Sequence, residues 1–236
     1  MNKVYAFCDI HGMYNLWKQI SEYCDKTDKI YFLGDAADRG PDGIKIIEEL
    51  LADKRIVYLK GNHEDFLIKI GTEILEGHTS SIRLWHENGG ASTIAGLLEK
   101  KENEVWDLIY KLNALPQVCE YINKQGQKII LSHAGDVLTY RKEYDRHGGS
   151  NYLWDRDHLT WDFEEDITDD MPYIVHGHTP VPALPHFGIY PESYFKIYKY
   201  CKGHKIDIDL GCFTTQRVAL LDLDTLEPIY FTQKEE

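Results

Sequence analysis

The sequence lacks the features that mark membrane, secreted and low-complexity proteins. No apolar run approaches the ~18 residues that a membrane-spanning helix needs. The N-terminus has no basic segment followed by an apolar one, so we expect no cleaved signal peptide. No repeat or Pro/Gly/Ser-rich tract suggests a linker. The 236 residues, 43% of them hydrophobic, therefore suit a single domain over residues 1–236. Such a domain would bury roughly 70–75% of its unfolded surface.

Cysteine is sparse, with five residues at irregular spacing. An odd number without a pattern favours free thiols in a reducing compartment, so we expect a cytoplasmic protein. No cysteine has an arginine six positions later, which excludes a cysteine-dependent phosphatase. A phosphate loop of the G-x-x-x-x-G-K type is also missing, which excludes nucleotide-triphosphate turnover by that route.

Positive charge is scarce, since 26 Lys and Arg face 39 Asp and Glu and leave a net charge of −13. This balance argues against broad binding to a polyanion. We therefore expect no nucleic-acid partner, and the missing apolar span predicts no membrane partner. A local positive site built from metals and a few arginines remains compatible with the charge.

The first sixty residues alternate apolar runs with helical stripes. We expect strands over 4–8, 29–33 and 55–59, with helices over 13–23 and 41–51 between them. This βαβαβ rhythm predicts parallel neighbouring strands joined by right-handed crossovers.

The remainder predicts a helical insert and two groups of strands. Residues 65–115 have a helical pattern that Asn88-Gly89-Gly90 interrupts and Pro116 ends. Segments 118–122 and 128–131 suggest a hairpin. The other expected segments are a loop with a short helix over 136–170 and strands over 173–175, 194–200, 205–210, 217–223 and 228–232. We expect the last strands to form an antiparallel layer. The fold class is therefore α/β, with two mixed sheets packed face to face and helices outside.

Polar groups that can bind metal follow five of the apolar runs. In open α/β sheets, binding crevices form at the carboxyl ends of strands, so we interpret these tips as one site. The five segments are Asp9-Ile10-His11-Gly12, Gly34-Asp35-Ala36-Ala37-Asp38-Arg39-Gly40, Gly61-Asn62-His63-Glu64, Ser132-His133-Ala134-Gly135 and His176-Gly177-His178-Thr179.

Carboxylate, imidazole and amide ligands suit Mn²⁺, Fe or Zn²⁺, with Mn²⁺ as the leading expectation. No cysteine joins the pattern, which argues against a structural zinc site. Two metals about 3.5–4 Å apart can clamp a phosphoryl group and lower the pKa of a bound water from ~15.7 toward ~7. Asp9 and His11 can point into one site from a single tip, and Asp35 can bridge from the next.

Together the motifs resemble the calcineurin-like metallophosphoesterase superfamily, whose pattern is D-x-H, G-D, G-N-H-[DE], H and G-H. They run in order over about three-quarters of the chain. The G-D-x-x-D-R-G and G-N-H-E segments, with Trp85 and Asn88-Gly89-Gly90, resemble the short bacterial and phage phosphoprotein phosphatases. The resemblance implies a metallophosphoesterase-type αββα sandwich. Ile206-Asp207-Ile208-Asp209-Leu210-Gly211 is similar to the family's late strand.

The resemblance also implies individual roles. Asp9, His11 and Asp35 would hold the first metal. Asp35, Asn62, His133 and His178 would hold the second. Many superfamily members carry another histidine where this chain has Pro180, so a water would complete the first metal's ligands.

The same resemblance implies the groups that act on the substrate. His63 would be the general acid, oriented by Asp38, and Arg39 would bind the phosphate together with Asn62. Arg156 is the candidate for a second phosphate-binding arginine, with Arg141 and Arg146 as competitors.

Each motif alone has an ordinary structural interpretation. Asp38 and Arg39 could form a surface ion pair, Asn62 could cap a helix, and Glu64 suits a helix's first turn. Surface or loop positions are the default for His158 and the other unmatched histidines. The convergence of five tips outweighs these interpretations.

The expected function is hydrolysis of phosphate monoesters, with phosphoserine or phosphothreonine on protein as the leading substrate. The alternative is hydrolysis of diadenosine tetraphosphate or a related nucleotide. Those hydrolases look similar but typically lack an acid at the position of Asp38. A catalytically inactive scaffold is a third possibility, which a lost ligand would favour, and none is lost. The substrate would be a phosphorylated protein or a small phosphoester, and the oligomeric state stays open.

Overall fold

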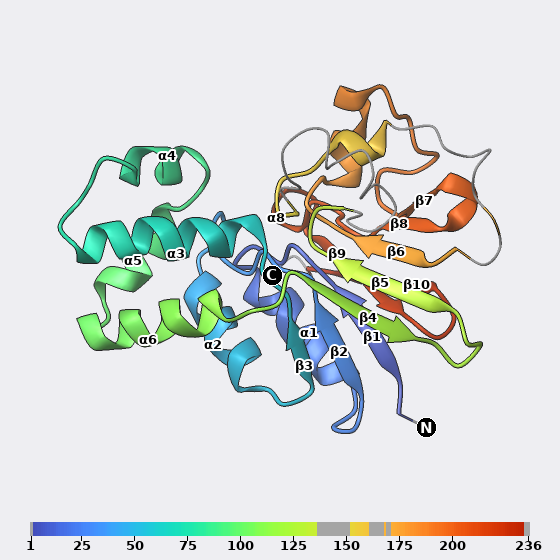
Figure 1. Ribbon diagram of the computed structural model, residues 1–236, viewed down its shortest axis with the longest axis horizontal. Coiled ribbons are helices and arrows are strands. Elements are labelled where there is room, and N and C mark those ends of the chain that lie inside the picture. The colour runs from blue at the N-terminus through green and yellow to red at the C-terminus, as the bar shows by residue number, and fades with distance from the viewer. Residues whose placement is uncertain (1, 136–151, 161–167, 169–170, 234–236) are drawn as a thin grey trace.

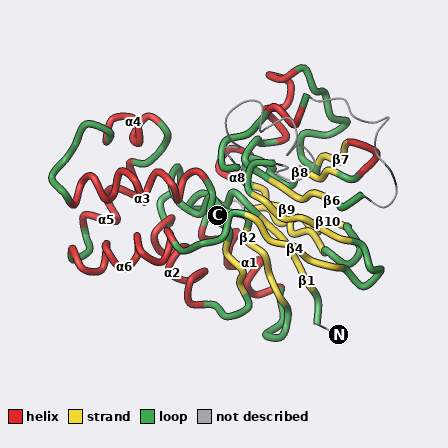
Figure 2. Tube along the Cα trace, in the orientation of Figure 1, coloured by secondary structure: helices red, strands yellow, loops and turns green. Residues whose placement is uncertain are grey.

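The computed structural model describes residues 2–135, 152–160, 168 and 171–233 (Figure 1). Ten strands in this part of the chain form two five-stranded sheets. The first sheet has the order β10-β9-β1-β2-β3, and the second has the order β4-β5-β6-β8-β7. Both are mixed, with three parallel strands in each. The expected fold class of two mixed sheets flanked by helices is confirmed (Figure 2).

The strands of the first sheet are β1 (Val4–Phe7), β2 (Lys29–Phe32), β3 (Ile56–Tyr58), β9 (Arg217–Asp222) and β10 (Glu227–Thr232). Those of the second are β4 (Val118–Ile122), β5 (Lys128–Ser132), β6 (Tyr173–His176), β7 (Tyr198–Tyr200) and β8 (Lys205–Asp207). The helices are α1 (Tyr14–Tyr23), α2 (Gly43–Ala52), α3 (Asn62–Leu75), α4 (Ile82–Glu87), α5 (Ala91–Leu98), α6 (Glu102–Asn113) and α8 (Cys212–Thr215). The 3₁₀ segments among the described residues are η1 (Asp157–Leu159), η3 (Val181–Phe187) and η4 (Cys201–Gly203).

Alternation along β1 explains why its sheet is covered on both faces. Tyr5 and Phe7 pack into a cluster with α1 and α2, whereas Ala6 and Cys8 face Ile129 and other residues of the second sheet. The two sheets therefore pack face to face.

The helices α3 to α6 form the expected insert, which lies to one side of the sheets (Figure 1). The stripe of Val105, Leu108, Ile109 and Leu112 on α6 is buried. Asn88-Gly89-Gly90 separates α4 from α5. No helix in the described residues is long and apolar enough to cross a membrane.

The predicted antiparallel layer at the end of the chain is confirmed only for the pairs β7–β8 and β9–β10, which lie in different sheets. Strands β9 and β10 do pair antiparallel, but β9 also pairs with β1 and extends the first sheet. Strand β8 instead pairs parallel with β6 in the second sheet. The alternation of residues marked these segments as strands but carried no information about their partners.

The predicted start of the second helix is also wrong by two residues. Helix α2 begins at Gly43 rather than at Pro41. The backbone N–H groups of Gly40 and Asp42 donate to the carbonyls of His11 and Gly12. These bonds hold the segment as a turn against the first strand tip. The expected loop over 136–170 lies largely outside the described residues, although η1 falls within it.

Candidate metal centre

The two sheets bring the five polar tips together. In the first sheet, parallel pairing aligns the carboxyl ends of β1, β2 and β3 at one edge. In the second sheet, the parallel pairing of β5 and β6 aligns their carboxyl ends in the same way. The six predicted metal ligands are all buried at this edge, with exposed fractions of 6% or less. They are Asp9, His11, Asp35, Asn62, His133 and His178. Residues more than 160 positions apart contact one another here, since the backbone N–H of His178 donates to Asp9 Oδ2 at 3.1 Å.

Three of these ligands form one cluster around Asn62. The Nδ1 of His133 lies 2.8 Å from the carbonyl oxygen of Leu33, to which it donates its proton. In the neutral ring, Nε2 is then unprotonated and has a free lone pair. That Nε2 lies 2.8 Å from Asn62 Oδ1 and 3.5 Å from Asp35 Oδ1. The Nδ1 of His178 lies 2.9 Å from the same Asn62 oxygen.

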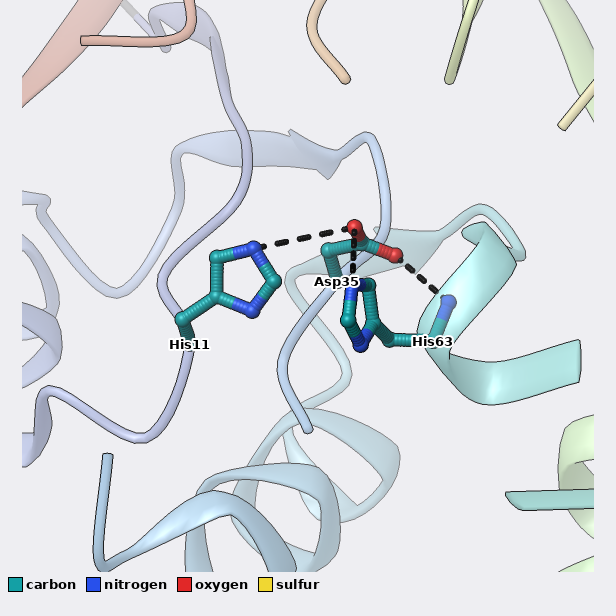
Figure 3. A group of neighbouring side chains, drawn as sticks. All are labelled: His11, Asp35 and His63. Carbon is teal, nitrogen blue, oxygen red and sulfur yellow. Dashed lines mark hydrogen bonds and ion pairs between the residues drawn. The ribbon is translucent and has the colours of Figure 1, made fainter. Parts of the chain in front are cut away.

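A second cluster lies on the other side of Asp35 (Figure 3). The Nδ1 of His11 donates to the carbonyl of Ala37 at 2.9 Å, which leaves its Nε2 unprotonated. This Nε2 lies 3.7 Å from Asp35 Oδ2 and 4.0 Å from Asp9 Oδ1. Asp35 therefore presents one oxygen to each cluster, as a bridging carboxylate would.

The donor atoms fit divalent cations. In the cluster around Asn62, two hydrogen-bond acceptors face each other at 2.8 Å, a contact that a cation between them would make favourable. The ligand atoms of Asp35, His133 and His178 lie within 4.8 Å of one another, and so do those of His11, Asp35 and His63. The second grouping contains His63 in place of the predicted Asp9. Unlike His11 and His133, whose Nδ1 atoms contact backbone carbonyls, His63 contacts the carboxylate of Asp38 through Nδ1.

Backbone strain is concentrated at this edge. Six of the non-glycine residues with positive φ among the described residues belong to the site: Asp9, His11, Asp35, Asp38, Arg39 and His178, with φ between 42° and 72°. Left-handed conformations of such residues cost of order 1–3 kcal/mol each and persist only where surrounding contacts hold them. Directing these side chains into the site therefore lowers the stability of the fold.

His63 pairs with Asp38 rather than with a backbone carbonyl. Its Nδ1 lies 2.6 Å from Asp38 Oδ2. Its Nε2 faces the clusters, 3.8 Å from Asp35 Oδ2. The guanidinium of Arg39 lies between the imidazoles, with Nη1 2.7 Å from His11 Nε2 and Nη2 3.4 Å from His63 Nε2.

Local charges set the protonation of the central groups. Burial alone would lower the pKa of His63, but the charge of Asp35 and the hydrogen bond that Nδ1 donates to Asp38 outweigh it and raise the pKa. Burial alone would raise the pKa of Asp35, but the neighbouring imidazoles lower it below its usual range. Burial, followed by the charges of Asp209 and Asp35, raises the pKa of Asp9.

Arg156 is half-buried, and its positive charge acts on the same groups. After burial, it is among the causes that lower the pKa of His133 and His178, while Asp35 acts on Arg156 in return. The ring of neighbouring Trp154 lies against His178, with centroids 5.8 Å apart. The competing candidates Arg141 and Arg146 lie outside the described residues.

Glu64 has a larger part in the site than its position in a helix's first turn suggested. Its carboxylate is fully buried and accepts the backbone N–H groups of Asp35, Ala36 and Gly61, each at 2.8 Å. Tyr58 donates to it as well, at 2.9 Å. Glu64 therefore fixes the turn that carries Asp35. The sequence feature that could have indicated this role is the position of Glu64 directly after Asn62 and His63, in the same motif.

Other buried polar residues were missed or misplaced. Asp207 and Asp209 are buried, the charge of Asp209 acts on Asp9, and burial raises the pKa of Asp209 to about 7. The default of a surface or loop position holds for His158 only in part, because it lies in the short η1 segment of the expected loop but has an exposed fraction of 1%. Its Nε2 donates to the carbonyl of Ala134 at 2.7 Å, next to His133. Nothing in the local pattern around these residues distinguished burial from exposure.

This fold and this cluster of carboxylates and imidazoles define a metal-dependent hydrolase. Residues 3–210 match the family described as calcineurin-like phosphoesterase, and the chain belongs to that family. The resemblance seen in the sequence is thus confirmed. The protein is a phosphoesterase, and its family uses a dinuclear centre of divalent metals.

Curated relatives carry two kinds of name. The chain is 29% identical to serine/threonine-protein phosphatase 2 of Escherichia coli over 74% of this chain and 78% of that protein. It is 26% identical to the asymmetrical bis(5'-nucleosyl)-tetraphosphatase PrpE of Oceanobacillus iheyensis over 89% of this chain and 84% of that protein.

Solved structures support the fold alone. A cold-active protein-tyrosine phosphatase of a psychrophilic Shewanella superposes with a TM-score of 0.58 at 14% identity, covering 98% of this chain and 77% of that one. A metallophosphoesterase from Sphaerobacter thermophilus gives 0.55 at 15% identity, covering 99% and 88%.

Proposed function

We propose that this phosphoesterase hydrolyses phosphate monoesters, with phosphoserine and phosphothreonine on protein as its substrates. The observation that carries the proposal is the contact between His63 Nδ1 and Asp38 Oδ2 at 2.6 Å, beside the two clusters. A monoester with an alkoxide leaving group needs a proton donor, and this pair provides one at the edge of the clusters.

In this proposal the metal ligands are those that the motifs indicated. Asp9, His11 and Asp35 would hold one cation, and Asp35, Asn62, His133 and His178 would hold the other. The described ligand atoms include no sulfur, which favours Mn²⁺, with Fe or Zn²⁺ as alternatives. When bound, the two cations supply a water of lowered pKa and neutralise charge on the phosphoryl group.

His63 is the proposed general acid. Asp38 fixes the ring through Nδ1, so that Nε2 points toward the clusters. Because Asp35 and Asp38 both favour the charged imidazolium and raise the pKa of His63, they favour a proton on Nε2. That proton would pass from Nε2 to the oxygen of the departing alcohol as the P–O bond breaks.

Arg39 and Arg156 are the proposed phosphate-binding cations, assisted by the amide of Asn62. The guanidinium of Arg39 already lies between His11 and His63, where phosphate oxygens would meet both the clusters and the acid. A guanidinium can donate two parallel hydrogen bonds to one phosphate, which fixes its orientation.

Two substrate classes compete, since the relatives are named after both. The acidic residue Asp38 favours a phosphoprotein substrate. The wide coverage of the tetraphosphatase PrpE favours the dinucleotide reading, which we keep as the second candidate.

A side-by-side comparison tests the choice. The Mn²⁺-loaded enzyme is assayed on a panel of phosphoserine, phosphothreonine and phosphotyrosine peptides and on diadenosine tetraphosphate, with kcat/KM measured for each. We expect the phosphoserine or phosphothreonine peptides to exceed the dinucleotide by at least tenfold. The reverse order would assign the protein to dinucleotide hydrolysis, and no turnover of either would favour a scaffold.

We also propose a cytoplasmic location and one domain over residues 1–236. Cys8, Cys24, Cys119 and Cys212 are free thiols, and all of these except Cys119 are buried. Free thiols suit a reducing compartment. Thr93 of α5 and Gly89, which precedes α5, bond to the backbone of Asp38 and Arg39, which suggests an insert within one domain rather than a second unit.

A further inference from the structure

The indole of Trp85 donates to the carboxylate that orients His63. Trp85 is fully buried, and its Nε1 lies 2.9 Å from Asp38 Oδ2. This is the same oxygen that accepts the bond from His63 Nδ1. The other oxygen, Asp38 Oδ1, has no hydrogen-bond partner within the described part of the chain. Two hydrogen bonds to Oδ2 therefore hold the Asp38 carboxylate, one from His63 and one from Trp85.

The indole is packed tightly against the backbone that follows its helix. Gly90 follows the helix that carries Trp85, and its N–H donates to the Trp85 carbonyl at 2.9 Å. A Cβ added to Gly90 would lie 2.5 Å from Trp85 Nε1, so the backbone packs directly on the ring. An indole N–H can only donate, and its position here is set by packing rather than by its partner.

The same connection between α4 and α5 also holds the backbone around Asp38. Asp38 and Arg39 both have left-handed φ values, 69° and 65°, which non-glycine residues seldom adopt. The N–H of Asp38 donates to Thr93 Oγ1 at 2.9 Å, and the N–H of Arg39 donates to the Gly89 carbonyl at 2.8 Å. The helical insert thus fixes both the side chain and the backbone of Asp38.

We propose that Trp85 is a positioning residue for leaving-group protonation, which it supports by fixing the Asp38 carboxylate and, through it, the His63 ring. This inference rests on the proposed acid role of His63. A carboxylate bonded to His63 alone can rotate about its Cβ–Cγ bond and carry the imidazole with it. The indole N–H removes that freedom and keeps Nε2 directed at the reacting ester.

The test compares two leaving groups in Trp85→Phe, which keeps a ring but removes the N–H. p-Nitrophenyl phosphate releases a stable anion that needs little protonation, whereas a phosphoserine peptide releases an alkoxide that needs a proton. We expect kcat on the peptide to fall about tenfold or more, a fraction of the ~10²–10⁴ that general acids contribute. We expect less than a twofold fall on p-nitrophenyl phosphate, with an unchanged content of bound Mn²⁺.

Trp17→Phe is the matched control. Trp17 is equally buried, and its Nε1 donates to a carboxylate, Glu49 Oε2, at 2.7 Å away from the site. We expect this variant to keep the wild-type ratio of the two rates. Equal losses on both substrates in Trp85→Phe, or the same change in ratio in Trp17→Phe, would overturn the inference.

Two further measurements separate this inference from the proposed function. If His63→Asn does not change the ratio of the two rates, the acid role itself fails. If His63→Asn changes it and Trp85→Phe does not, only the role of Trp85 fails. Should Trp85→Phe not fold, 3-benzothienylalanine at position 85 replaces the N–H with sulfur in a ring of the same shape. The expected change in ratio and the overturning result are then the same.

Discussion

At the scale of single residues, Asp35 and Asp38 both act on the protonation of His63. The folded pKa of His63 is raised, although burial opposes it, because the charges of Asp35 and Asp38 favour the imidazolium. Bound cations would offset the charge of Asp35, which leaves Asp38 as the group that keeps the ring protonated. An acid that must be protonated loses activity as the pH rises through its pKa.

Asp38→Asn therefore has two expected effects. The turnover of a phosphoserine peptide falls by about 10²-fold or more, because the general acid loses its partner. The alkaline limb of the pH profile of kcat moves to lower pH, because the pKa of His63 decreases without the carboxylate. Steady-state kinetics between pH 5 and 9 on the Mn²⁺-loaded variant measure both effects. An alkaline limb that stays in place would assign the titration to another group.

At the scale of elements, the turn between β2 and α2 depends on Glu64 at the start of α3. This carboxylate accepts three backbone N–H groups and the Tyr58 hydroxyl, all of them buried. An amide at this position would direct an NH₂ group toward N–H donors and leave at least one of them unsatisfied. Each unsatisfied buried group costs about 1–3 kcal/mol.

We expect Glu64→Gln to lower the free energy of unfolding by about 2–4 kcal/mol and to weaken metal binding, because Asp35 is carried by this turn. Urea unfolding with chelator present measures the first effect, and Mn²⁺ titration measures the second. Glu49→Gln is the control, since Glu49 accepts bonds from Tyr14 and Trp17 far from the site. Equal losses of metal affinity in both variants would contradict this role.

Local patterns predicted most of the elements, for physical reasons visible in the structure. The period of the apolar residues in 4–8, 29–33 and 105–112 reports burial directly, and these segments form β1, β2 and α6. Strand partners over long distances carry no such signal. The distribution of β8 and β9 between two sheets therefore could not be read from their alternation.

The candidate site was partly predictable for a related reason. Each predicted metal ligand lies within a few residues of the end of an apolar run, so motif and topology together placed Asp9, Asp35 and His133 at one edge. Residues that act through other residues were harder to find. The contacts of Trp85 and His158 depend on how the insert and the η1 segment fold back onto the tips.

At the scale of the whole molecule, buried neutral histidines link stability to pH. His176 and His158 are buried behind the site and share the Tyr200 hydroxyl, at 2.8 and 2.9 Å. Burial lowers the pKa of His176 to about 3, and that of His158 is lowered well below its ordinary value. Both rings therefore take up a proton when the chain unfolds below pH ~6.5.

Because unfolding takes up protons, we predict that a lower pH decreases the free energy of unfolding. Each ring leaves stability unchanged above pH ~6.5 and subtracts up to about 1.4 kcal/mol per pH unit as the pH falls from there toward the folded pKa. Urea unfolding of the chelated protein at pH 7.5, 6.5 and 5.5 measures the slope. His158→Asn should reduce it, whereas the same change at the exposed His78 should not. A slope that is equal in all three proteins would contradict the prediction.

The arrangement of the whole chain serves one purpose in this account, which is to seat two cations on either side of Asp35. The most direct test is anomalous diffraction at the manganese edge from crystals grown in excess Mn²⁺. We expect two peaks about 3.5–4 Å apart, bridged by Asp35, with Asp9 and His11 on one ion and Asn62, His133 and His178 on the other. A single peak, or ions held by other residues while these six stay unligated, would contradict the account.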